Sequence, residues 1–377
     1  MSNHSKDGRF DRPQMGIYHP YEFFFCGFSN SGKTTLMSKV ISRLSSKYDI
    51  ACVKHCSHRY NFDREGKDSW HFTKAGAQHV MLNAPGKWTS HTQSDFSKFE
   101  FNEQLRNADF VLAEGAKEQP GDKILVLDRD LKIIEALKEG ELTQVKALAG
   151  EVRPEEDFGL PFFHRDDIDA ISEFILEKLK SNTPQLKALL LTGGKSSRMG
   201  KDKAYLEYVG KPQLNRAYDL LKKKVSDVRV SCKSKEDYPG FDENVYLEDR
   251  FDGFGPLGGI LTAISEDAQS AWLVMAVDLP FVDDSVLDHL LENRNPFKTA
   301  TAFKSNFKEF PEPLFTIYEP QARHNIFKFL GLGYSCPRKV LINSTVEELE
   351  QQNPRWLDNG NTPEEYEEIC KVLENGN

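Results

Sequence analysis

The segment GFSNSGKTT, residues 27–35, constrains the fold of this chain more than any other stretch. It matches the phosphate-loop pattern G-x-x-x-x-G-K-[ST]. The apolar run YEFFFCGF leads into it, and TTLMSKVISRL, whose apolar residues have helical spacing, follows. In that setting the backbone N–H groups at the start of the helix surround the phosphates of a nucleotide. The segment therefore predicts a strand, a phosphate loop and a helix.

The phosphate loop supplies the first set of candidate binding residues. We expect Lys33 to reach the β and γ oxygens of a triphosphate and the Thr34 hydroxyl to ligate Mg²⁺. Glu114 ends the apolar run ADFVLAEG, where it is either an acidic partner of that magnesium or a solvated loop glutamate. The complete predicted set for this site is Gly27, Asn30, Ser31, Gly32, Lys33, Thr34 and Thr35, with Thr34 and Glu114 as the metal ligands.

Short apolar runs alternate with amphipathic stretches along the whole chain. After the phosphate loop come IACVKH, DFVLAEGA and KILVLD, and a helical pattern spans residues 168–180. The alternation stops at SNTPQ and starts again with LKALLLTGG, PQLNRAYDLLKKK, DVRVSCKS and AWLVMAVDLP. Alternation of strands and helices predicts parallel sheets covered by helices. Because 377 residues exceed the roughly 250–300 residues of a single core, we expect two unrelated α/β domains.

The composition argues against several classes of protein. A net charge of −9 and a pI near 5.7 disfavour a nucleic-acid-binding chain, which needs a dense basic face. No apolar run approaches the roughly 20 residues that cross a bilayer, so we expect a cytoplasmic protein with no membrane segment. The six cysteines lack paired spacing. Whether Cys52, His55, Cys56 and His58 bind a metal stays open at this point.

A second glycine loop, LTGGKSSRMGKDK at residues 191–203, follows the apolar run that opens the second half. Thr192, Gly193 and Gly194 come at the carboxyl end of the expected strand, where glycines let the backbone approach an anion. Arg198 and Lys203 add side-chain charge, because arginine can bind phosphate through two hydrogen bonds and lysine acts as a point charge. The spacing predicts a second phosphate site on a different kind of loop.

Two aspartates follow other apolar runs of the second half. Asp278 closes AWLVMAVD, and a carboxylate at the end of a buried strand is costly unless it meets a cation, for which Mg²⁺ is the natural choice. Alternatively, Asp278 caps the turn ahead of Pro280. Asp249 precedes a glycine-rich turn into a helix, an arrangement that is consistent with a loop lying against a nucleotide.

Three segments of the first half, GFSNSGKTTL, VKHCSHRYNFDREGKDSWHFTKAGA and LAEGAK, carry a family resemblance. In this order and spacing they resemble MobB, the P-loop GTP-binding adaptor of molybdenum-cofactor maturation, over about residues 22–180. The resemblance implies that GTP and Mg²⁺ bind at Gly32, Lys33 and Thr34, with Glu114 as the acidic partner. It also implies weak GTPase activity. We also consider a homodimer formed through this domain.

The second half resembles MobA, the molybdenum-cofactor guanylyltransferase, across roughly residues 186–377. LTGGKSSRMGKDKAYLEYVGKP is close to the family signature, and LEDRFDGFGPLGGI, VMAVDLPF and NGNTPEE follow in the family's order. Ser231 stands where the family commonly has asparagine. The resemblance implies GTP contacts from Leu191, Thr192, Gly193, Gly194, Lys203, Ser231, Asp249 and Asp278, with Arg198, Lys203 and Asp278 as catalytic residues and Asp278 as the Mg²⁺ ligand.

The C-terminal part of the chain holds candidates for contact with the pterin substrate. Within NTPEE, the threonine, the proline and the second glutamate form a helix-capping box, so their structural role explains them. Asn359 and Asn361, just upstream, are better candidates for the ligand. Arg338 in CPRKVL either binds the pterin phosphate or forms a solvated basic pair with Lys339.

These features together predict an α/β chain of two domains, a P-loop NTPase domain and a Rossmann-like nucleotidyltransferase domain. Each is expected to contain a mostly parallel sheet with helices on both faces. The expected boundaries are a flexible N-terminus at 1–20, the first domain at 21–180, a linker at 181–186 and the second domain at 187–377.

The resemblance implies a reaction in which GMP passes from GTP to the terminal phosphate of molybdenum-molybdopterin, with Mg²⁺ as cofactor and pyrophosphate as the second product. We expect the dinucleotide to pass to molybdoenzymes and cofactor-insertion proteins. Spacing alone does not distinguish guanine from cytosine. A nucleotidyltransferase that uses CTP or a sugar phosphate is therefore one alternative, and a non-catalytic module that delivers the cofactor is another.

Overall fold

The structure, a computed structural model, describes residues 18–56, 64–92, 98–115, 117–193, 202–306, 310–360 and 362–375. The chain separates into two compact units, Met1–Asn182 and Thr183–Asn377. Of the predicted flexible segment at 1–20, residues 1–17 lie outside the described part, whereas Tyr18 and His19 are buried. Among the described residues, no helix has both the length and the apolar character that crossing a membrane requires.

The first unit is built on a six-stranded sheet whose neighbouring strands all run parallel. Across the sheet the order is β2 (Ile50–Lys54), β5 (Phe110–Glu114), β1 (Glu22–Cys26), β6 (Lys123–Val126), β7 (Val145–Gly150) and β8 (Phe162–His164). The phosphate loop follows β1, a central strand. The strands predicted from the apolar runs are therefore confirmed, and the loop leaves the carboxyl edge of the sheet.

Helices cover both faces of this sheet because β1 sends alternate aromatic side chains to opposite sides. Phe23 packs edge-on against Phe174 of α5 (Ile168–Lys180), with ring centroids 6.4 Å apart, and α5 lies beside α1 (Lys33–Leu44). Phe24 belongs to the core of the other face, where α4 (Ile133–Lys138) contributes Ile133. The helical spacing at 168–180 therefore predicted α5 correctly.

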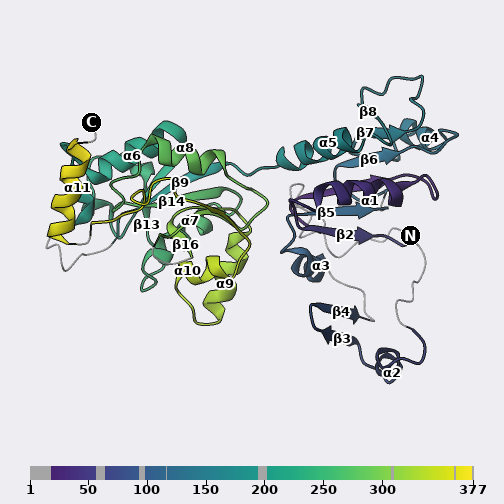
Figure 1. The fold of residues 1–377 in the computed structure, drawn as a ribbon, viewed down its shortest axis with the longest axis horizontal. Coiled ribbons are helices and arrows are strands. Elements are labelled where there is room, and N and C mark those ends of the chain that lie inside the picture. Colours follow the sequence, from purple (N-terminus) through teal and green to yellow (C-terminus); the bar gives the residue numbers. More distant parts are fainter. Residues whose placement is uncertain are drawn as a thin grey trace. The chain divides into compact units, whose positions relative to one another are not determined.

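A hairpin stands apart from the main sheet of the first unit (Figure 1). Its strands, β3 (His79–Ala84) and β4 (Lys87–Thr92), pair antiparallel, and α2 (Asp68–Lys74) contacts β3. A further helix of this unit, α3 (Lys98–Leu105), precedes β5. Met81, Leu82 and Trp88 of the hairpin are exposed apolar side chains.

The second unit contains a seven-stranded sheet that is parallel except at one strand. The order is β13 (Tyr246–Glu248), β12 (Val228–Cys232), β9 (Leu186–Leu191), β14 (Ala271–Ala276), β16 (Pro311–Tyr318), β15 (Ala300–Lys304) and β17 (Val346–Leu349). The strand β16 pairs antiparallel with both of its neighbours. The prediction of a mostly parallel sheet is confirmed. β9 begins at Leu186, which the sequence placed at the end of the linker.

The central strands of the second sheet are buried on both faces, and their alternation separates two cores. Leu190 belongs to the core shared with α6 (Gln213–Lys224) and α8 (Asp284–Glu292). Leu189 and Leu191 belong to the opposite core, shared with α7 (Pro256–Glu266), α9 (Ala322–Gly331) and α10 (Pro337–Ile342). Helices therefore lie on both faces of this sheet as well, as predicted.

The C-terminal helix α11 (Pro363–Asn375) packs on a small separate core rather than on the sheet. The Thr362 Oγ1 atom accepts a hydrogen bond from the Glu365 backbone N–H at 3.2 Å, and a Glu365 carboxylate oxygen accepts one from the Thr362 N–H at 3.1 Å. The predicted capping box is therefore confirmed. Ile369 of α11 meets Tyr208 in the short antiparallel pair β10 (Glu207–Tyr208) and β11 (Lys211–Pro212).

Among the residues of the second unit that the structure describes there are also three short 3₁₀ helices. They are η1 (Lys203–Tyr205), η2 (Lys235–Asp237) and η3 (Glu243–Val245). The first of them carries Lys203 directly after the second glycine loop. It begins where the Asp202 carboxylate accepts a hydrogen bond from the Ala204 N–H at 2.9 Å.

Candidate functional site

The phosphate loop of the first unit is a tight turn between β1 and α1, and its glycines are required by its geometry. Gly32 caps α1 with φ of 91°, in the left-handed region that favours glycine. A Cβ atom on Gly27 would lie 2.5 Å from the carbonyl oxygen of Val126 in β6. Asn30, another predicted contact, also has a positive φ, 63°. The backbone conformation of the loop by itself therefore suits the binding of an anion.

Lys33 folds back onto its own loop. Its Nζ atom donates a hydrogen bond to the carbonyl oxygen of Phe28 at 2.7 Å. Lys117 lies over the Phe28 ring, with its Nζ atom 4.3 Å from the ring centroid. Burial lowers the pKa of Lys33; Glu114 opposes that shift, and the charge of Lys117 adds to it. Two cations therefore gather around the loop.

Thr34 and Glu114 lie together, as the metal-site prediction requires. The Thr34 hydroxyl is 2.8 and 2.9 Å from the two carboxylate oxygens of Glu114, which is the last residue of β5. Lys54, at the end of β2, pairs with the same carboxylate at 3.3 Å. Glu114 is only 9% exposed, so the alternative of a solvated loop glutamate is wrong. A hydroxyl and a carboxylate are hard oxygen ligands, so this pair fits Mg²⁺.

The remaining loop residues differ in their exposure. Ser31 is buried, and its carbonyl oxygen accepts a hydrogen bond from Arg165 at 3.3 Å. Thr35 is exposed on the first turn of α1. Within the described part of the chain, no group of three or more His, Cys, Asp or Glu side chains forms a cluster suited to a metal. Cys52 and Cys56 are exposed, and His58 of the open metal question lies outside the described residues.

The second site is assembled by three adjacent parallel strands. Leu191 ends β9 and is in register with Ser231 of β12 on one side and Ala276 of β14 on the other. The carboxyl ends of these strands therefore meet at one edge of the sheet. Thr192, buried, donates from its hydroxyl to the Ser231 carbonyl oxygen at 2.5 Å. Gly193 follows at an exposed position, whereas Gly194 and Arg198 lie outside the described residues.

Lys203 and Asp278 meet at this edge. The Lys203 Nζ atom lies 2.8 Å from a carboxylate oxygen of Asp278, and the two side chains are 13% and 23% exposed. Asp278 comes two residues after β14, and Lys203 opens η1. The Asp278 carboxylate therefore has the Lys203 cation as its partner, and this pairing offsets the cost of burying the charge. The fold brings together the two predicted catalytic residues that it describes.

Ser231 and Asp249 form the other half of the site. The Ser231 hydroxyl donates to a carboxylate oxygen of Asp249 at 2.7 Å. Burial raises the pKa of Asp249, and the hydrogen bond from Ser231 opposes that shift. Gly259 of α7 packs against Ser231 so closely that a Cβ atom built on it would lie 2.5 Å from the Ser231 Oγ atom. Asp249 is therefore hydrogen bonded to β12 through Ser231, which stands where the family resembled in the sequence commonly has asparagine.

The structure describes two of the three residues that were predicted to contact the pterin. Arg338 of α10 pairs with Glu312 of β16 at 3.2 Å, so Arg338 is not merely a solvated cation. Burial raises the pKa of Glu312, Arg338 opposes the shift, and the charge of Asp278 adds to it. Asn359 is exposed just before α11, and Asn361 lies outside the described residues.

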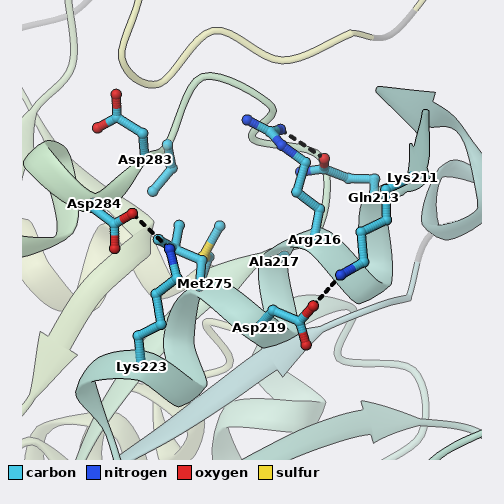
Figure 2. Close-up of a pocket in the computed structure, with 11 residues that line it drawn as sticks. Lys211, Gln213, Arg216, Ala217, Asp219, Lys223, Met275, Asp283 and Asp284 are labelled. Atoms are coloured by element: carbon cyan, nitrogen blue, oxygen red, sulfur yellow. Dashed lines mark hydrogen bonds and ion pairs between the residues drawn. The ribbon is translucent and has the colours of Figure 1, made fainter. Parts of the chain in front are cut away.

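A cavity of about 310 Å³ lies beside the loop that follows Asp278 (Figure 2). Its lining cations are already paired, as Lys223 meets Asp284 at 2.8 Å and Lys211 meets Asp219. Arg216 donates to the carbonyl oxygen of Pro280 at 2.7 Å, two residues beyond Asp278. The cavity does not include Lys203 or Asp278, and the lining residue that contacts the loop after Asp278 is Arg216.

Sequence reasoning missed Lys54, Lys117, Arg165 and Glu312 as members of these sites. Lys54 ends an expected strand, as Glu114 does, and this shared position was a usable signal. Lys117 follows Glu114 closely in LAEGAK. Nothing local marks Arg165 or Glu312, because each reaches its site through contacts with residues far away in the sequence.

Comparisons with known proteins match both units. The sequence model of the family described as "Molybdopterin guanine dinucleotide synthesis protein B" matches residues 23–151, and that of the "MobA-like NTP transferase domain" matches residues 188–356. The chain is 33% identical over 190 residues to the "Molybdenum cofactor guanylyltransferase" of Pseudomonas aeruginosa, an alignment that covers 49% of this chain and 94% of that protein.

Two further relatives are matched over part of their length. The chain is 36% identical over 190 residues to the "Molybdenum cofactor biosynthesis bifunctional protein" of a Synechocystis species, covering 50% of this chain and 54% of that protein. It is 37% identical over 107 residues to the "Molybdopterin-guanine dinucleotide biosynthesis adapter protein" of Haemophilus influenzae, covering 26% of this chain and 59% of that protein. The chain thus spans a little over half the length of these two relatives.

Proposed function

Because this chain belongs to the molybdenum cofactor guanylyltransferase family, we propose that its second domain transfers GMP from GTP to molybdopterin. The first domain, which precedes it in the sequence, matches the MobB family model. The acceptor is the terminal phosphate of molybdenum-molybdopterin, and the products are the guanine dinucleotide cofactor and pyrophosphate. The observation that supports this most directly is the meeting of Lys203 and Asp278 at the edge of the sheet where β9 and β12 end.

The reaction needs no protein nucleophile. A phosphate monoester is largely dianionic at neutral pH because its second pKa is about 6. One of its oxygens attacks the α-phosphorus of GTP, and the bond between that phosphorus and the bridging oxygen of the β-phosphate breaks. The protein must hold two anions close together and stabilise the charge on the departing pyrophosphate. Lys203 supplies one positive charge for this task, and Arg198 is proposed to supply another.

Asp278 is proposed to hold Mg²⁺, whose chemistry would be to neutralise charge on the phosphates of GTP. Asp249, linked to Ser231, is proposed to contact the nucleoside side of GTP. The turn at Thr192, Gly193 and Gly194 would let the backbone approach the phosphates. For the acceptor side, Arg338, Asn359 and Asn361 are proposed to contact the pterin substrate.

For the first domain we propose binding and slow hydrolysis of GTP at the phosphate loop. Lys33 would leave the Phe28 carbonyl oxygen and bind the β- and γ-phosphates. Thr34 and Glu114 would hold Mg²⁺, since their oxygens already lie within 2.9 Å of each other. The proposal further includes transfer of the product to molybdoenzymes and cofactor-insertion proteins, and a homodimer formed through this domain.

The test uses the full chain with GTP, Mg²⁺ and molybdenum-molybdopterin, and follows both pyrophosphate and the dinucleotide. Removing one group that stabilises transition-state charge lowers kcat by about 100-fold or more, so Lys203→Ala and Asp278→Ala should each lose at least that much. Lys223→Ala is the matched control, because Lys223 also pairs with an aspartate at 2.8 Å but on an exposed surface.

Three outcomes would count against the proposal. Wild-type rates in both Lys203→Ala and Asp278→Ala would exclude the catalytic role and favour a module that only delivers the cofactor. Preferential use of CTP, measured in parallel reactions, would overturn the choice of guanine. Unchanged protection of residues 27–36 by GTP in Lys33→Ala, measured by hydrogen exchange, would exclude the phosphate loop as the first nucleotide site.

A further inference from the structure

Arg165 places its guanidinium directly over the phosphate loop. Its Nη2 atom donates to the carbonyl oxygen of Ser31 at 3.3 Å. A Cβ atom built on Gly32 would lie only 1.8 Å from the same Nη2 atom, so the guanidinium occupies the space above that glycine. Gly32 therefore serves two needs, the left-handed turn before α1 and the close approach of this arginine.

The position of Arg165 is fixed by the packing of α5 against α1. Arg165 lies between β8 and α5, and its neighbour Asp166 pairs with Lys39 of α1 at 2.8 Å. One turn further along, Asp169 pairs with Arg43. Because α1 begins at the phosphate loop, these contacts hold the arginine at a set position relative to the loop.

The charge partner of Arg165 is Glu151. Its carboxylate lies 3.1 Å from the Nη1 atom, and Glu151 is 45% exposed whereas Arg165 is 22% exposed. A guanidinium carries five N–H donors in a fixed fork that matches phosphate geometry. The contacts with Ser31 and Glu151 use one donor on each Nη atom. A phosphate in the loop would be a stronger acceptor than the neutral carbonyl oxygen of Ser31, because its negative charge attracts the guanidinium and its oxygens can accept two parallel hydrogen bonds from it.

We propose that Arg165 is a phosphate-binding residue of the first domain, and that Glu151 competes with the phosphates of a nucleoside di- or triphosphate for the Arg165 guanidinium. This inference rests on the proposed binding of a nucleotide at the phosphate loop. It goes beyond the family match, because Arg165 lies outside residues 23–151, the stretch that matches the MobB model. It also adds a third cation to Lys33 and Lys117 around the loop.

The test measures GDP and GTP binding to the full chain with Mg²⁺, read locally as protection of residues 27–36 from hydrogen exchange across a titration. The local readout separates this site from nucleotide bound to the second domain. We expect Arg165→Ala to raise the Kd about 10- to 100-fold, the loss typical of a hydrogen bond between charged groups. Arg165→Lys should give a smaller increase, since it keeps the charge but not the fork.

Arg129→Ala is the matched control, because Arg129 also lies near Glu151, at 3.8 Å, but is 86% exposed. It should bind as the wild type does. Glu151→Gln should tighten binding several-fold, because it removes a competing negative charge near the phosphates. If Arg165 had only a structural role, Glu151→Gln would loosen the loop and weaken binding instead.

The outcomes also separate this inference from the function on which it rests. Unchanged binding in Arg165→Ala together with lost binding in Lys33→Ala would overturn the role of Arg165 and leave the phosphate loop as a nucleotide site. Unchanged binding in Lys33→Ala would overturn the nucleotide site itself. Weakened binding in Glu151→Gln would show that the arginine and the glutamate act as a structural pair, which contradicts the proposal.

Discussion

The Nζ atom of Lys203 lies 2.8 Å from a carboxylate oxygen of Asp278, although 75 residues separate them in the sequence. The first domain repeats this relationship with other chemistry, as the Thr34 hydroxyl lies 2.8 Å from a carboxylate oxygen of Glu114. In each site, two groups that are proposed to bind ligands are hydrogen bonded to each other. Ligand binding must therefore exchange an internal contact for an external one, and this exchange can be measured.

Replacing Lys203 with methionine should make it possible to measure how Mg²⁺ takes the place of the lysine beside Asp278. Lys203→Met leaves the Asp278 carboxylate without its lysine partner in a site that is mostly shielded from water. We expect the free energy of unfolding of the second domain to fall by about 1–2 kcal/mol, less than for a fully buried pair because both groups keep some exposure. Mg²⁺ should then restore more stability to this variant than to the wild type, as measured by thermal unfolding with and without the metal.

The control for the metal effect is Lys203→Met combined with Asp278→Asn. The double variant lacks the carboxylate, so any gain in stability from Mg²⁺ at this site should disappear. An equal gain from Mg²⁺ in the single and double variants would show that Asp278 does not hold the metal.

Gly259→Ala should destabilise the second domain by about 1–3 kcal/mol, the usual cost of overpacking a core. The added Cβ atom would lie 2.5 Å from the Ser231 Oγ atom and 2.7 Å from a methyl carbon of Leu191. Helix propensity alone predicts the opposite sign, because alanine is favoured over glycine inside a helix by about 1 kcal/mol. Chemical denaturation of both proteins decides between the two.

Gly331→Ala, at the end of α9, is the matched control for this substitution, since no atom of the described residues lies within 4 Å of a Cβ atom built there. It should leave stability unchanged or raise it slightly. Stabilisation by Gly259→Ala would show that Leu191, Ser231 and α7 are not packed together as described.

His19 should make the first domain sensitive to acid. Burial lowers the pKa of His19 to about 4, and its Nδ1 atom lies 3.1 Å from the Tyr21 backbone nitrogen. The unfolded chain keeps a pKa near 6.5, so between these values the unfolded state binds more protons than the folded state. The contribution of His19 to stability is therefore complete above about pH 6.5 and is lost as the pH falls towards 4, by up to about 3 kcal/mol.

The measurement compares the wild type with His19→Asn, which offers an amide oxygen near the position of Nδ1. Hydrogen exchange of the β1 amides, corrected for its intrinsic pH dependence, gives the local stability at pH 4.5 and 7.5. The loss between the two pH values should be smaller in His19→Asn. Parallel losses in both proteins would mean that other groups cause the acid sensitivity.

Local patterns in the sequence predicted most of the elements. The apolar run at β1 and the glycine at position 32 predicted the strand, the phosphate loop and the start of α1, because these depend on side chains and turn chemistry within a few residues. The helix at 168–180 and the capping box before α11 followed for the same reason. The antiparallel direction of β16 could not be read in this way, because strand direction depends on pairing across the sheet.

The candidate residues divide along the same line. By itself the sequence determined which residues at or after the ends of strands are candidates for the sites: Thr34, Glu114, Lys203 and Asp278 were all chosen from local patterns. Only the tertiary structure decided their partners, placing Leu191 between Ser231 and Ala276, Lys203 on Asp278, and Arg165 over Gly32. The physical reason is that a helix, a turn or a strand end is specified by neighbours in the chain, whereas an ion pair between distant residues depends on strand order and register, which the whole core sets.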